Sequence, residues 1–259
     1  MLLTTAYFPP IEYFALLAKY SSVYVEACEN YQKQSYRNRC RILTANGPEA
    51  LNVPVVHEGG TFALPIKEIR VEYSTPWVQR TERAIESAYY SSPFFIYYRD
   101  ALFAILDSHP ETLWELNGRI VDFFCRKIGI APEIHETVSF APAVACPADT
   151  GTAGPRSAGG HIPSEPVTAA PSSLPSVVGP LPFTMPRAAC LPEGMCPPAA
   201  VADDYRSVIH PKRPNTIMRD LGLERPYWQV FRDKFGFVPG LSIMDLLFNE
   251  GPESICWLR

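Results

Sequence analysis

Three arginines at alternate positions are the strongest chemical signal in the chain. Arg37, Arg39 and Arg41 fall within residues 36–44, which also contain Tyr36, Cys40 and Ile42. If this segment is a strand, its two-residue period places the three guanidinium groups on one face, about 7 Å apart. Groups of like charge at this spacing repel one another unless anions lie between them, and the planar guanidinium suits phosphate or carboxylate. The pattern therefore predicts an anion-binding face.

Neighbouring residues complete the predicted site. We assign anion and donor binding to Arg37, Arg39 and Arg41 together with Lys33, Asn38 and Tyr36, and general-base catalysis to Glu29 or Glu26. A carboxylate beside arginines stays ionised at neutral pH and can accept a substrate proton. Two structural alternatives stay open: the acids are internal partners of the arginines, or the arginines pair loosely on a solvated strand face. A pocket with a carboxylate favours an enzyme, whereas a sealed Arg–Glu network favours structure alone.

Other catalytic chemistry has weaker support in the sequence. No glycine-rich phosphate loop, dinucleotide-binding motif, nucleophile elbow or complete zincin motif is present, so we expect no metal and no cofactor. Cys28 or Cys40 would be a nucleophile if a histidine such as His57 activated it, but free cysteine is more often a small core residue. The seven cysteines include no C-x-x-C pair, which argues against a disulfide framework and a four-cysteine zinc site.

Charge and composition narrow the class of partner. The formal net charge of −4 argues against the broad basic face that binds nucleic acid. Residues 166–186 contain no Lys, Arg, Asp or Glu and are long enough to cross a bilayer. They also contain six prolines, so they cannot form a membrane-spanning helix. Because the N-terminus also lacks the basic region of a signal peptide, we expect a cytoplasmic protein with no membrane span. The oligomeric state stays open.

Periodicity and turn residues predict the elements that must position these groups. The expected strands are residues 2–8, 21–27, 66–73 and 133–140, with a hairpin formed by residues 36–44 and 51–56 around Asn46-Gly47. The expected helices are residues 11–19, 77–90, 94–106, 112–128, 227–235 and 242–249. In the last of these, Ser242 and Asp245 have the spacing of a capping box.

The resulting fold class is α/β or α+β, with an N-terminal mixed sheet and hairpin packed by a helical half. Residues 142–201 contain thirteen of the 27 prolines and few periodic apolar residues, which predicts a disordered, proline-rich insertion. We therefore expect a core of residues 1–141, the insertion at 142–201, and a short C-terminal helical region at 202–259 that packs back on the core.

Several segments, taken in order, resemble the WbqC-like family, which is named for a protein of O-antigen gene clusters. They are residues 7–14 (YFPPIEYF), residues 29–42 with their Tyr-Arg-Asn-Arg core, residues 51–55, Trp77 with the following helix, residues 89–95 and residues 241–251. The chain departs from the family pattern at Thr4-Thr5-Ala6, where many members have His-Gln-Pro, and at Cys28-Glu29, where many have an acidic pair. A reaction that depends on that histidine would be altered or lost in this chain.

The resemblance implies a transferase of bacterial surface polysaccharide biosynthesis that moves an aminoacyl or acyl group to an activated sugar. The implied partner is a phosphate-bearing small molecule such as a nucleotide sugar or an acyl donor. The alternative is a noncatalytic anion-binding or scaffold protein of the same pathway.

Overall fold

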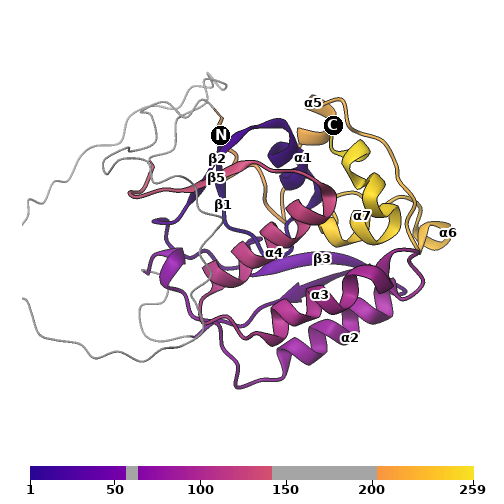
Figure 1. The fold of residues 1–259 in the computed structure, drawn as a ribbon, viewed down its shortest axis with the longest axis horizontal. Coiled ribbons are helices and arrows are strands. Elements are labelled where there is room, and N and C mark those ends of the chain that lie inside the picture. Colours follow the sequence, from indigo (N-terminus) through magenta and orange to yellow (C-terminus); the bar gives the residue numbers. More distant parts are fainter. Residues whose placement is uncertain (57–63, 142–202) are drawn as a thin grey trace, which may run out of the picture. The chain divides into compact units, whose positions relative to one another are not determined.

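Two small sheets and a set of helices make up the described part of the chain, which in the computed structural model comprises residues 1–56, 64–141 and 203–259 (Figure 1). The expected mixture of strands and helices is confirmed, with a parallel sheet and a separate antiparallel hairpin. The proline-rich segment at 142–201 lies outside the described residues. So does His57.

The parallel sheet contains β1 (Leu2–Thr4), β2 (Ser22–Glu26) and β5 (Glu133–Glu136) in the order β1-β2-β5. Helix α1 (Ile11–Lys19) connects the first two strands, as a parallel pair requires. The far edge of β1 is covered by the C-terminal part of the chain, because the Leu2 N–H donates to the Asp203 carbonyl at 2.9 Å. Each strand lies where the sequence predicts one and is shorter than predicted.

The hairpin pairs β3 (Arg39–Thr44) with β4 (Gly47–Asn52), from Arg39 opposite Asn52 to Thr44 opposite Gly47. The two-residue loop is therefore Ala45-Asn46, and Gly47 opens the second strand with a φ of +112°. The sequence predicts this hairpin with two wrong bounds: the first strand is expected to begin at residue 36, and the second is expected at residues 51–56, whereas β4 begins directly after the turn at Gly47. Residues 33–38 instead form turns, so Arg37 precedes the strand.

The predicted strand at residues 66–73 is wrong. Residues Ile66–Glu68 form a 3₁₀ turn, η2, and only isolated bridges follow, from Arg70 to Thr112 and from Val71 to Val55. Ile66 and Ile69 are both buried, and their three-residue spacing is the period of a 3₁₀ turn. The strand is predicted because Ile69, Val71 and Tyr73 alternate with polar residues, and that pattern leaves Ile66 on the polar face.

Three helices follow close to their predicted positions: α2 (Trp77–Tyr89), α3 (Phe95–Asp107) and α4 (Leu113–Ile128). Helix α4 has local signals at both ends. The Thr112 side chain accepts a hydrogen bond from the Glu115 N–H at 3.2 Å, and Gly129 ends the helix in the left-handed conformation. Leu116, Ile120 and Phe124 supply its fully buried stripe.

The C-terminal part contains α5 (Ile217–Asp220), α6 (Arg232–Phe235), α7 (Ile243–Glu250) and the 3₁₀ segment η3 (Gly251–Trp257). The predicted helix at residues 227–235 is present only as the four residues of α6. Helix α7 starts at a Ser242 cap, whose Oγ accepts from the Met244 N–H at 3.3 Å, and it is buried through Asn249.

The chain that enters α7 is joined to both the hairpin and α1. The Ser242 N–H donates to the Arg41 carbonyl at 2.8 Å, the Ile11 N–H to the Leu241 carbonyl at 3.1 Å, and the Ile243 N–H to the Pro9 carbonyl at 2.9 Å. These bonds bring the start of α1, strand β3 and residues 241–243 to one place.

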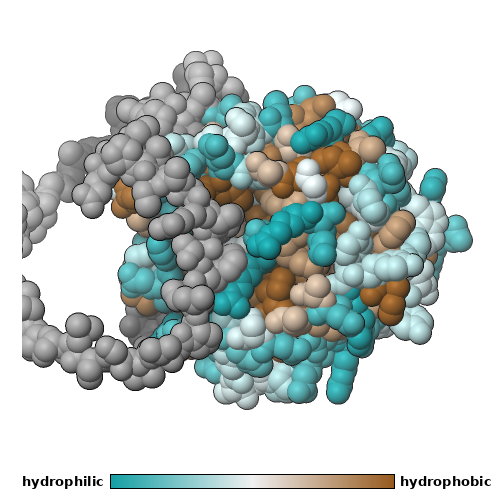
Figure 2. Space-filling view, in the orientation of Figure 1, coloured by the Kyte–Doolittle hydropathy of each residue, from teal (hydrophilic) through white to brown (hydrophobic). Residues whose placement is uncertain are grey.

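Exposed apolar residues are scattered over the surface. On the face drawn in Figure 2, brown apolar areas are small and are separated by teal polar ones. The most exposed large apolar side chains are Tyr90, Tyr97, Val138 and Ile96. Scattered exposure of this kind is usual for a folded domain.

Gly251 tests how tightly α7 is packed. A Cβ at this position would lie 2.6 Å from the Phe94 ring, and its φ of +56° disfavours other residues. We predict that Gly251→Ala lowers the free energy of unfolding by about 3 kcal/mol in denaturant titrations. The control is Gly129→Ala, where φ is +85° and no atom lies within 4 Å of the added Cβ. This control should cost about 1 kcal/mol, and equal losses in the two variants would contradict the packing.

Candidate functional site

Arg37 and Glu29 form a sealed ion pair. The Arg37 Nε donates to Glu29 Oε1 at 2.8 Å, and Arg37 Nη2 pairs with Glu29 Oε2. Both side chains are about 95% buried. Burial raises the pKa of Glu29, and Arg37 opposes that rise. The predicted row of three arginines is wrong for Arg37, because it lies before β3 and its guanidinium is occupied by an internal carboxylate.

Glu26, the other predicted general base, is fully buried among donors from distant parts of the chain. Its carboxylate accepts from Thr137 Oγ1 at 2.6 Å and from the N–H groups of Cys28 and Ala141, each at 3.0 Å. Arg206 Nη1 completes the set at 3.0 Å. These bonds tie β2 to the segment after β5 and to the C-terminal part.

Three further predicted binding residues lie on or near the hairpin. Asn38 donates its amide to the Val53 carbonyl at 2.9 Å, and Arg39 Nε donates to Asn52 Oδ1 at 2.7 Å. Lys33 is exposed on the preceding turn. The structure therefore does not gather the predicted residues around a single ligand position.

Cys28 and Cys40, for which the sequence favours a core role over a nucleophilic one, have different surroundings. Cys40 is fully buried in β3, and burial raises the pKa of its thiol far above its ordinary value. The Sγ of Cys28 lies 3.8 Å from the Thr137 carbonyl. Burial keeps the Cys40 thiol protonated, which suits a core residue rather than a nucleophile.

Glu12, which is not among the predicted site residues, lies near Arg41 and Tyr36. Glu12 lies in the first turn of α1, is 8% exposed, and has no hydrogen-bond partner for Oε2 among the residues described. Burial raises the pKa of Glu12, while its own backbone N–H and Arg41 oppose that rise. Burial and Glu12 raise the pKa of Tyr36 to about 12, and Arg41 opposes them. The three groups therefore share one electrostatic environment.

Gly240 marks the point where Glu12 and Arg41 approach each other. A Cβ there would lie 3.6 Å from Glu12 Oε1 and 3.8 Å from Arg41 Nη1. Gly240 has a φ of +68°, which favours glycine, and it immediately precedes the residues that join α1 to β3. The backbone can pass close to both charged groups because no side chain intervenes.

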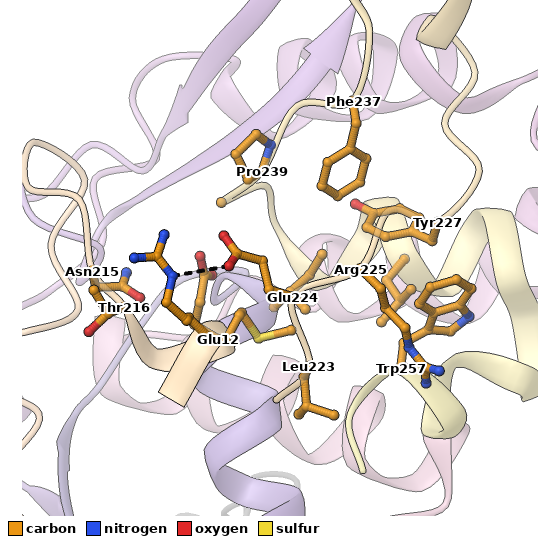
Figure 3. Close-up of a pocket in the computed structure, with 15 residues that line it drawn as sticks. Glu12, Asn215, Thr216, Leu223, Glu224, Arg225, Tyr227, Phe237, Pro239 and Trp257 are labelled. Carbon is orange, nitrogen blue, oxygen red and sulfur yellow. Dashed lines mark hydrogen bonds and ion pairs between the residues drawn. The ribbon is translucent and has the colours of Figure 1, made fainter. Parts of the chain in front are cut away.

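A cavity of about 170 Å³ lies beside Glu12 (Figure 3). Ile11 and Glu12 line it from α1, and the other lining residues come from positions 215–257. On one side, Arg219 Nε and Glu224 Oε2 form an ion pair at 3.1 Å. On another side, Tyr227 has edge contacts with Phe237 at 5.3 Å and Trp257 at 6.0 Å between ring centroids. The cavity thus combines a buried carboxylate with an aromatic wall.

A buried polar network holds Tyr227 in that wall. The Tyr227 hydroxyl donates to Asp245 Oδ2, and Gln229 Nε2 donates to the same oxygen at 3.0 Å. Gln229 also accepts from the Val238 N–H at 2.9 Å. The capping-box prediction is therefore wrong for Asp245, whose carboxylate faces Tyr227 while the Ser242 N–H binds the Arg41 carbonyl.

Comparison with known proteins gives the family. The model of the WbqC-like protein family matches residues 5–146. The chain belongs to the WbqC-like protein family. An uncharacterized protein of Mycobacterium tuberculosis, Rv1507c, is 26% identical over 254 residues, which covers 98% of this chain and 94% of that protein. No solved structure matches. The family match contains Glu12, Tyr36 and Arg41, whereas residues 215–257 of the cavity lie beyond it.

The described part of the chain contains neither a membrane-spanning helix nor a cluster of metal-binding side chains. Within residues 1–56, 64–141 and 203–259, no helix is long and apolar enough to cross a membrane. In the same ranges, no group of three or more His, Cys, Asp or Glu side chains is placed to hold a metal ion.

Asp245 predicts a specific pH dependence of stability. Burial raises the pKa of Asp245 from its ordinary value to about 6, against the opposing hydrogen bonds from Tyr227 and Gln229. The folded protein then binds the Asp245 proton more tightly than the unfolded chain does. Its contribution to stability is present at about pH 4 and is lost as the pH rises through 6.

Relative to Asp245→Asn, the wild-type free energy of unfolding should fall by about 2 kcal/mol between pH 4 and pH 7 in denaturant titrations. Asp100→Asn, at a side chain that is 88% exposed, is the control and should keep the wild-type slope. An unchanged slope in Asp245→Asn would disprove the buried, proton-binding state of this carboxylate.

Proposed function

We propose that this protein is a transferase that moves an acyl or aminoacyl group from an activated, phosphate-bearing donor to an acceptor held beside Glu12. Membership of the WbqC-like family supports a setting in bacterial surface polysaccharide biosynthesis, with a sugar as the acceptor class. The observation that carries the proposal is a buried carboxylate without a donor for Oε2, lining a cavity and adjacent to a guanidinium.

Glu12 fits the role of general base better than Glu26 or Glu29. The carboxylates of Glu26 and Glu29 accept hydrogen bonds from donors in the chain, whereas Glu12 lines the cavity. Burial raises the pKa of Glu12, which makes its carboxylate a stronger base. A base must also lie within hydrogen-bond reach of the proton that it removes, and the cavity provides that place.

The volume of the cavity limits the size of the group that can bind beside Glu12. Sites for drug-sized ligands usually enclose about 300–1,000 Å³, and this cavity encloses about 170 Å³. That space suits a single small group rather than an entire nucleotide sugar. We therefore place the acceptor group in the cavity and the reacting end of the donor toward Arg41.

In the proposed step, the N–H or O–H bond of the acceptor breaks and its proton passes to Glu12. The acceptor atom forms a bond to the carbonyl carbon of the donor, and the bond to the donor's leaving group breaks with its electron pair. Arg41 places positive charge near the negative charge that develops during this transfer, which lowers the barrier. Tyr36, beside Arg41, helps to fix the position of the guanidinium.

Glu12→Gln and Arg41→Gln test these roles separately. We predict that acetyl phosphate or UDP-glucose raises the melting temperature of the wild type, and that Arg41→Gln removes this shift. Glu12→Gln should keep the shift but lose at least about 10²-fold in product formation, measured by mass spectrometry, because an amide cannot accept the proton. Controls are Arg126→Gln and Glu49→Gln, both at exposed side chains outside the cavity.

Two results would contradict the assignment. An undiminished shift in Arg41→Gln would exclude Arg41 as a donor-binding residue, and full product formation by Glu12→Gln would exclude the general base. A melting-temperature shift in the wild type with no product from any donor and acceptor pair would favour the noncatalytic anion-binding or scaffold alternative.

A further inference from the structure

We infer that the acceptor is a small ring-bearing primary amine, such as an amino sugar, whose amine donates to the Glu12 carboxylate while its ring packs against Tyr227, Phe237 and Trp257. This inference rests on the proposed function and specifies the chemical class of one substrate. It is carried by the contrast between Glu12 and the other charged groups of the cavity.

The charged groups on the opposite side already have partners in the chain. Arg219 Nε is paired with Glu224 Oε2 at 3.1 Å. The guanidinium of Arg225 lies 4.6 Å from the Trp257 ring centroid, and its Nη2 donates to the Cys256 carbonyl. Arg219 and Glu224 are 69% and 64% exposed, so their opposite charges offset each other in contact with water. Arg225 is also exposed. Water screens these exposed charges, so they act on a ligand more weakly than the buried Glu12 does.

Glu12, in contrast to these arginines, is buried and has an oxygen without a hydrogen-bond donor. Its side chain is more than nine-tenths buried, and Oε2 accepts no hydrogen bond from the residues described. Oε2 is itself sealed from solvent, so binding a ligand there requires rotation about the terminal torsion of Glu12, which is soft and roughly two-fold in a glutamate. An ionised carboxylate only accepts hydrogen bonds, and a buried one needs compensating donors or positive charge. An ammonium group supplies both, whereas a phosphate or carboxylate would be repelled. In the transfer step the ammonium gives one proton to Glu12, the resulting neutral amine attacks the carbonyl carbon, and the second proton leaves with the donor's leaving group.

The aromatic wall adds a requirement for shape. Tyr227 is nearly fully buried and is held by Asp245 and Gln229, so its ring is a fixed surface rather than a mobile one. Phe237 and Trp257 stand edge-on to it. Figure 3 shows these three rings together, apart from Glu224. A rigid apolar wall fits the carbon face of a six-membered ring, and aromatic faces also attract ammonium groups.

The test compares three probes that differ at one position: glucosamine, glucose and N-acetylglucosamine. Their dissociation constants for the full-length protein are measured by titration calorimetry. We expect glucosamine to bind about tenfold or more tightly than either other sugar, because a hydrogen bond between charged partners is stronger than a neutral one. Glu12→Gln should remove this preference, and Glu49→Gln, at an exposed glutamate of β4, should keep it.

A second variant examines the wall independently of the carboxylate. Phe237→Ala should weaken all three sugars by a similar factor and leave the ratio between glucosamine and glucose unchanged. Circular dichroism and melting temperature establish that each variant is folded before its affinity is interpreted.

The outcomes separate this inference from the proposed function. Equal binding of the three probes, a preference that survives in Glu12→Gln, or no binding of any probe would overturn the amine acceptor. A Glu12-dependent preference for glucosamine without any transfer product would support the amine site and contradict the transferase. Product formed on a hydroxyl acceptor, without amine preference, would support the transferase and overturn the inference.

Discussion

Glu12 places a carboxylate inside the protein at the junction of three distant segments. The start of α1, strand β3 and residues 240–243 meet there, and Gly240 lets the backbone pass beside both Glu12 and Arg41. Taking a carboxylate out of water has a cost that internal donors can offset. Oε2 receives no such donor from the described residues, and the nearby Arg41 guanidinium offsets part of the cost.

The arginines of the hairpin region divide into two roles. Arg37 and Glu29 form a buried ion pair, and removing one partner of such a pair leaves an uncompensated charge inside the protein. Arg41 extends from β3 toward Glu12 and Tyr36, where its charge influences groups beside the cavity. Thus the structural interpretation of the arginine pattern applies to Arg37, and the proposed function rests on Arg41.

Local sequence signals predicted most of the elements correctly. Gly129 and Thr112 define the ends of α4, and residues 44–47 define the hairpin turn, because these signals act within a few residues. The arginine row was misjudged because an alternating pattern cannot show where a strand begins, and turns at residues 33–38 displace Arg37. Glu12 carried one available signal, an acid within the otherwise apolar run that opens α1. Its partners could not be predicted, since the opposite wall comes from residues 215–257.

The most direct test of this account is the titration of Glu12 itself, followed through its side-chain carboxyl ¹³C resonance. The resonance, assigned with Glu12→Gln, should titrate with a pKa above the ordinary value for glutamate of about 4.3. Replacing Arg41 with Gln should move that pKa higher, since Arg41 opposes the effect of burial. A Glu12 pKa at or below the ordinary value would contradict a desolvated carboxylate. A Glu12 pKa that is the same in the wild type and in Arg41→Gln would contradict its position beside this guanidinium.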